Sequence, residues 1–152
     1  ALEDGKIDGF WANGMGAEVA VTRGAGTMVI DARRGDGPST AFNFTMPALI
    51  TSQKMIDDEP DACAAAVRAL VKTQKALRED VSLATEVGKK RFPETEAGLI
   101  AQVVERDLPF YTAAITEDFV VGMNKFQKDV GLVTGDLKYE QVVATQFMSE
   151  WE

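Results

Sequence analysis

The residues best placed to do chemistry follow a short apolar stretch near the start of the sequence. Trp11, Asn13 and Gly14 come at the end of residues 6–12, which predict a strand, and before residues 17–23, which predict a short helix. In open α/β sheets, ligands bind at the carboxyl ends of strands, and the free N–H groups of a following helix favour anions. An indole face and an amide that donates and accepts suit a small-ligand pocket. The alternative is a Trp packed in the core beside an ordinary Asn-Gly turn.

Three other groups of residues are better explained as structural features. Gly14 and Gly16 begin the dinucleotide-binding pattern G-x-G-x-x-G, but Val19 occupies the position of the third glycine. The basic run at residues 89–91 ends a predicted helix, where cations offset the carbonyl dipole. The acidic run at residues 57–59 precedes a helix and lacks the EF-hand spacing of a calcium site.

The composition excludes several classes of site. The chain has 152 residues, no histidine, a single cysteine and a net charge of −8. Without histidine there is no Ser–His–Asp or Cys–His couple and no histidine-based zinc site, and one cysteine allows no internal disulfide. The negative charge argues against nucleic-acid binding, which needs a dense basic face. We therefore expect no catalytic residue, no metal and no cofactor.

The hydrophobic pattern changes from strands to helices along the chain. Strands are predicted at residues 6–12, 27–32 and 41–52, and helices at residues 17–23, 61–79, 81–91, 94–108, 117–130 and 139–151. In the longest helix, Cys63, Val67, Leu70 and Leu77 form one apolar stripe, so Cys63 is expected to be a small buried hydrophobe. Strands interleaved with helices predict an α/β fold with few strands and several helices.

The predicted sheet is thin, and the start of the sequence is unusual. Parallel strands need both faces covered, so the missing strands are expected from residues outside this sequence or from a partner chain. There is no initial Met, and Ala1 to Gly5 resemble the last turn of a helix with Gly5 in a left-handed cap. These features predict a carboxy-terminal piece of a longer chain, and the alternative is a short lead-in before the first strand.

Four stretches in this order resemble a known family. They are A-L-x-x-G-K-I-D-G at residues 1–9, the strand at residues 27–32, the extended segment at residues 44–52, and A-x-x-A-L-x-K-T-Q-K-A-L at residues 66–77. Together they resemble the C-terminal portion of ABC-transporter periplasmic substrate-binding proteins. The most similar group is the one for nitrate, sulfonates, taurine and the thiamine pyrimidine precursor, which are type II binding proteins.

The resemblance implies a two-lobed α/β receptor that closes on its ligand. Residues 1–38 would be the end of lobe two and the crossover, and residues 39–152 the C-terminal part of lobe one. By position, the residues that would face the ligand are Trp11, Asn13, Gly14, Phe42 and Asn43. The receptor would capture a small anionic or heterocyclic ligand in the periplasm and deliver it to an ABC permease of the inner membrane, without a cofactor and without catalysis.

Two other functions stay open at this point. One is an enzyme of the same fold family that makes the thiamine pyrimidine and consumes its own active-site histidine. The other is a ligand-sensing regulatory domain joined to a DNA-binding module. Because an unpaired sheet edge invites pairing, we also expect this fragment to associate with itself.

Overall fold

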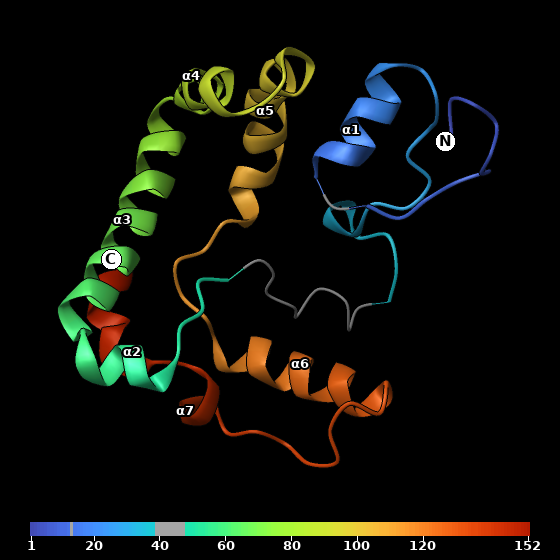
Figure 1. The fold of residues 1–152 in the computed structure, drawn as a ribbon. Helices are drawn as coiled ribbons and strands as arrows, with labels where there is room; N and C mark the ends of the chain where they lie inside the picture. The colour runs from blue at the N-terminus through green and yellow to red at the C-terminus, as the bar shows by residue number, and fades with distance from the viewer. Residues whose placement is uncertain (13, 39–47) are drawn as a thin grey trace. The chain divides into compact units, whose positions relative to one another are not determined.

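The structure of the chain is a computed structural model that describes residues 1–12, 14–38 and 48–152 (Figure 1). Helices make up 62% of these residues, and none of them lies in a strand. In chain order, with η for 3-10 helices, the elements are α1 (Met15–Thr22), η1 (Ala32–Arg34), α2 (Gln53–Asp58), α3 (Pro60–Glu79), α4 (Ser82–Arg91), α5 (Glu94–Asp107), η3 (Leu108–Phe110), α6 (Glu117–Asp129), α7 (Tyr139–Val142) and η4 (Thr145–Trp151).

The prediction of an α/β fold, and with it of a fragment of a two-lobed α/β receptor, is therefore wrong for the described residues. The predicted strands at residues 6–12 and 27–31 are neither helix nor strand, and the same holds for residues 48–52. The remainder of the third predicted strand, residues 41–47, lies outside the described residues. A helix pairs its backbone N–H and C=O groups within its own segment, whereas a strand needs a neighbouring strand to pair them. These short, separated segments supply no such partner to one another.

The chain divides into two compact units. The first consists of Ala1–Asp31 with Gln74–Tyr111, and the second of Ala32–Thr73 with Thr112–Glu152. Few side chains of the described residues are buried, and most of them lie on helices. The buried apolar residues are Cys63, Val71, Ala97, Leu99, Val143 and Phe147, and the buried polar ones are Asp31 and Asn124.

In the first unit, α4 and α5 form a helical hairpin around Phe92 and Pro93 (Figure 1). The helices approach closely at Gly88, where a Cβ atom would lie 2.7 Å from Cδ1 of Ile100. Ala97 and Leu99 of α5 are buried. A residue without a side chain is therefore what allows the two helices to pack at this point.

The predicted helix boundaries in the middle of the chain are close to the observed ones, because they depend on local signals. Pro60 is the first residue of α3, where its missing N–H costs nothing. Thr116 caps α6, and its side chain accepts a hydrogen bond from the N–H of Phe119 at 3.4 Å. Gly131, at φ 75°, follows the last residues of that helix and ends it, close to the predicted end at residue 130.

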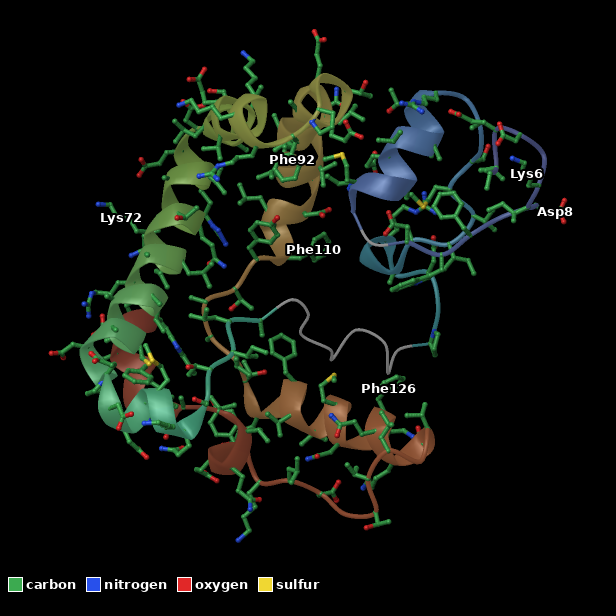
Figure 2. The ribbon with its side chains drawn as sticks, viewed as in Figure 1. Lys6, Asp8, Lys72, Phe92, Phe110 and Phe126 are labelled. Carbon is green, nitrogen blue, oxygen red and sulfur yellow. The ribbon has the colours of Figure 1, made fainter. Side chains whose placement is uncertain are left out.

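Two details of the predicted helices are wrong. Leu70 was expected on the buried stripe of α3, but it is exposed and Val71 is buried instead, while Cys63 is buried as expected. Lys72 extends outward from the same helix (Figure 2). The last predicted helix, residues 139–151, is broken between α7 and η4, because Val143 adopts an extended conformation and is buried.

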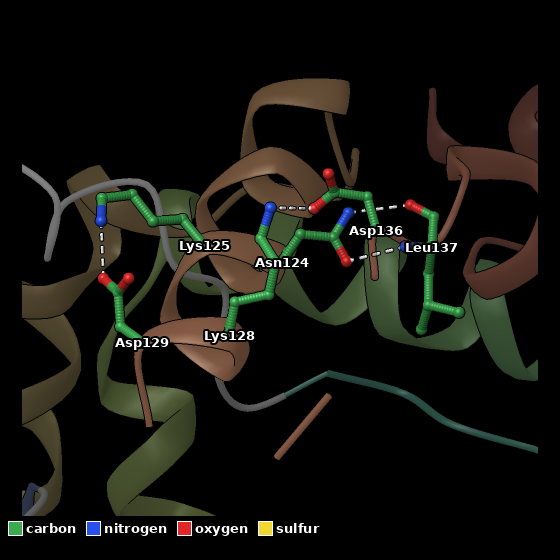
Figure 3. A network of polar contacts seen from close by, with 6 residues as sticks. All are labelled: Asn124, Lys125, Lys128, Asp129, Asp136 and Leu137. Carbon is green, nitrogen blue, oxygen red and sulfur yellow. Dashed lines mark hydrogen bonds and ion pairs between the residues drawn. The ribbon is translucent and has the colours of Figure 1, made fainter. Parts of the chain in front are cut away.

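In the second unit, side chains tie loops to helices. The amide of Asn124 on α6 donates to the carbonyl oxygen of Leu137 at 2.8 Å and accepts from its N–H at 3.1 Å (Figure 3). The hydroxyl of Tyr139 donates to the carbonyl oxygen of Ile115 at 2.5 Å. Asn124 is buried, so this pair of hydrogen bonds replaces the water that the loop backbone would otherwise need. These contacts have a structural role, since the Asn124 amide and the Leu137 backbone groups satisfy one another.

Candidate functional site

The residues singled out by sequence fall in different places. The side chain of Trp11 is 90% exposed. Gly14 precedes α1 as its N-cap, at φ 45°. Asn13, Phe42 and Asn43 lie outside the described residues. The assignment of these residues to a ligand site therefore stays a prediction.

The stretch that contains Trp11 does line a cavity, but with other side chains. The cavity is a shallow depression that is largely open to solvent; it has a volume of about 310 Å³ and lies within the first unit. Its lining residues are Ala1, Leu2, Glu3, Ile7, Phe10, Gly16, Val19, Ala20, Arg23 and Ala25. Its size is at the lower end of the range for small-molecule sites, and its lining is mostly apolar.

The walls of the cavity come from two turns and one helix. Gly5, at φ 65°, turns the N-terminal segment: its N–H donates to the carbonyl oxygen of Leu2 at 2.9 Å. At the other wall, α1 ends in a Schellman motif. The N–H of Gly24 donates to the carbonyl oxygen of Val21, and that of Ala25 to the carbonyl oxygen of Ala20, both at 2.9 Å.

A second glycine keeps the N-terminal segment close to this helix end. A Cβ atom at Gly26 would lie 2.9 Å from Cδ2 of Leu2, which lines the cavity. Because Gly26 has no side chain, the side chain of Leu2 can pack against its backbone. In the sequence, Gly24 and Gly26 indicate only the end of the predicted helix at residues 17–23.

One ion pair lies in the lining. Nη1 of Arg23 is 3.5 Å from Oε1 of Glu3, and both side chains are about half exposed, at 49% and 51%. Lys6 and Asp4 form a separate pair at 3.1 Å, and Lys6 and Asp8 extend from the N-terminal segment (Figure 2). Sequence reasoning missed Glu3 and Arg23, because nothing in their spacing along the chain indicates that they meet.

The opposite side of α1 is attached to α5. Glu18 and Arg106 form an ion pair, and both side chains are largely shielded from solvent. Arg106 also reaches Asp107, with 3.1 Å between Nε and Oδ1. Since α1 supplies one wall of the cavity, this pair holds that wall against the helical hairpin.

The titratable groups that depart from their usual pKa are not in the cavity. Hydrogen bonds from the hydroxyl and N–H of Ser82, at 2.6 and 2.9 Å, hold the pKa of the Asp80 carboxyl below its usual range. Burial, with a smaller effect of the Asp107 carboxylate, raises the pKa of Tyr111. Burial also raises the pKa of Tyr139, helped by Glu117 and Glu140. Both phenols therefore stay protonated around neutral pH.

Neither a metal-binding cluster nor a membrane-spanning helix occurs among the residues that the structure describes. No three His, Cys, Asp or Glu side chains among them gather in a way that could hold a metal ion. None of their helices combines the length and the apolar character needed to cross a bilayer. The basic run at residues 89–91 forms the last turn of α4, as predicted.

The cavity offers an apolar wall and a guanidinium group, and its lining includes neither a hydroxyl nor a thiol. Comparison of the chain with family models, curated proteins and solved structures gave no match.

Proposed function

We propose that the protein is the solute-binding component of an ABC importer, which captures a small anionic or heterocyclic ligand and delivers it to a membrane permease. The observation that carries this proposal is the order of the motifs at residues 1–9, 27–32, 44–52 and 66–77. Each motif is common by itself, but their succession resembles the substrate-binding proteins named above. The described residues are helical and form no clamp between two α/β lobes.

The cavity in the first unit is consistent with ligand capture. It lies in the stretch that the sequence had marked for small-ligand binding, and residues 7 to 23 supply several of its lining residues. An apolar wall with a single guanidinium suits a ligand that is organic at one end and anionic at the other.

Binding is favoured over catalysis by the groups available. The chain has no histidine, and the lining of the cavity has no nucleophile–base couple. A binding component needs neither, because it makes and breaks no bond. We accordingly propose a periplasmic location and a permease of the inner membrane as the partner.

A thermal-shift screen of the protein tests this proposal. The probes are nitrate, taurine, alkanesulfonates, pyrimidines and aromatic acids, each well above its expected Kd. A ligand at about 100 times its Kd adds about 2.7 kcal/mol to the free energy of unfolding, which raises the Tm of a chain of this length by about 5–10 °C. If no probe raises the Tm, the proposal is wrong.

Further measurements separate the proposed function from its alternatives. Ligand recovered unchanged after incubation, together with loss of uptake of that ligand in cells lacking the protein, supports a transport component. Chemical conversion of the ligand would support the enzyme instead. Ligand-dependent binding of the protein to DNA would support the regulatory domain, and either result would overturn the transport proposal.

A further inference from the structure

Arg23 is the one cationic side chain among the residues that line the cavity, and the carboxylate of Glu3 already lies next to it. Arg23 has several N–H donors in a planar fork, which match a carboxylate or sulfonate in a paired geometry. Glu3 approaches Nη1 only to 3.5 Å, outside the 2.7–2.9 Å of a charge-assisted hydrogen bond. Glu3 therefore pairs with the guanidinium group by charge, without a short hydrogen bond.

The exposure of the pair makes it exchangeable. About half of each side chain is open to solvent, so the pair is screened by water and contributes little to stability. Glu3 can rotate into solvent without leaving a buried charge behind. An external anion of better geometry can then take its place at Arg23.

The remainder of the lining sets the character of the ligand. Leu2, Ile7, Phe10, Val19 and Ala20 offer hydrocarbon surface to the part of the ligand that is not charged. The neighbouring carboxylates of Glu3 and Asp4 disfavour a second negative charge, although Lys6 offsets Asp4. A single anionic group on a small apolar body fits both conditions.

We infer that this cavity binds a small organic monoanion whose charged group replaces Glu3 at Arg23. The inference rests on the proposed function and deepens it by naming the ligand class and the residues that select it. Glu3 then acts as a built-in competitor: its carboxylate holds the arginine in the empty protein and lowers the affinity for the ligand. Arg23 is the anion-binding residue, and Glu3 sets the strength of binding.

Calorimetric titration of the protein with benzoate and benzenesulfonate tests the inference, with neutral benzamide and cationic benzylammonium as comparison probes. The two anions should bind more tightly than either comparison probe. Arg23→Ala removes the charged hydrogen-bond donor, so affinity for the anions should fall at least about tenfold. Glu3→Gln removes the competing charge while keeping the size of the side chain, so affinity should rise about two- to fivefold.

The controls separate binding from folding. Arg34→Ala removes an arginine that pairs with Asp36 at 2.7 Å and does not line the cavity, so it should leave anion affinity unchanged. Arg23→Lys keeps the charge but loses the fork, so its affinity should lie between that of the wild type and that of Arg23→Ala. The Tm of each variant shows that it is folded.

The outcomes also distinguish the inference from the proposed function. If the anions bind but Arg23→Ala and Arg34→Ala behave alike, the inference is overturned while the proposed function stands. It is also overturned if Glu3→Gln weakens binding, or if benzamide binds as tightly as benzoate. If neither anion binds but another probe of the thermal-shift screen raises the Tm, the inference alone fails. If no probe of either kind binds, both fail.

Discussion

The helical hairpin and the extended segment at residues 27–30 belong to the same unit and are both rich in apolar residues, but they differ in what they bury. In the hairpin, Leu99 is 9% exposed and the two helices touch at Gly88. In the extended segment, Val29 is 83% and Ile30 70% exposed. The two regions differ in the packing partner that each requires. Two helices joined by a short turn are close in sequence and pack against each other, whereas an isolated extended segment needs a strand that is distant in sequence.

The comparison teaches that apolar, β-branched sequence is not enough to form a strand. Residues 27–30 have strong strand propensity and were predicted as part of a strand, yet no strand of the described chain lies alongside them. Ile50 is a second example: it belongs to the predicted strand at residues 41–52, and its side chain is 87% exposed. An exposed apolar side chain contributes little to the free energy of unfolding, and the effect of truncating it can be measured.

The largest expected effect comes from truncating one residue in each region. Leu99→Ala should lower the free energy of unfolding by about 2–5 kcal/mol, because removing most of a buried side chain leaves a cavity in its place. Ile30→Ala removes a similar volume from an exposed side chain and should cost less than about 0.5 kcal/mol. Urea titration of both variants measures the two values. Equal costs would mean that residue 30 is buried against a partner, and the contrast between the regions would not hold.

A smaller effect is expected from two glycines that lie at different places in the hairpin. Gly88→Leu forces a side chain between α4 and α5, where even a Cβ atom meets Ile100, and should cost about 1–3 kcal/mol. Gly98, in the middle of α5, has no atom within 4 Å of a built Cβ. Gly98→Ala should therefore stabilise the protein by up to about 1 kcal/mol through helix propensity. A stabilising Gly88→Leu would show that the two helices are not packed at this residue.

The smallest effect concerns the start of the hairpin. Hydrogen bonds from Ser82 favour the charged form of Asp80, so its pKa in the folded chain lies below the usual aspartate range. The sign follows from linkage: the contribution to stability is present above the unfolded pKa and is lost as the pH falls through the lowered folded pKa. NMR titration of the carboxyl carbon should show the low pKa, and Ser82→Ala should move it back toward the usual range. An unshifted pKa in the wild type would contradict the capping interaction.

Much of the helical part of the fold could be predicted because its signals are local. Pro60, Thr116 and Gly131 act within one turn of the helix ends that they mark, through a missing N–H, a side-chain acceptor and a positive φ. The predicted sheet failed for the opposite reason, since it depended on partners that no local pattern can guarantee.

For the candidate cavity as well, local features could be predicted and contacts between separate segments could not. The sequence pointed to residues 7–23 as a place for a ligand, and the cavity lies there in part. It pointed to Trp11, whose side chain is exposed, and not to Glu3 and Arg23. A pairing across a loop depends on how the turns at Gly5 and Gly24 fold the segment back, which spacing alone does not reveal.

By itself, the sequence determined where helices begin and end, where glycine must turn the chain, and which site chemistries its composition excludes, because these depend on covalent structure and on hydrogen bonds within a few residues. Only the tertiary structure decided that Val71 and not Leu70 is buried, that Glu3 meets Arg23, and that α1 is tied to α5 through Glu18 and Arg106. These outcomes depend on the packing of segments that are distant in the chain, whose free energy is set by the surfaces that come together and not by the residues one at a time.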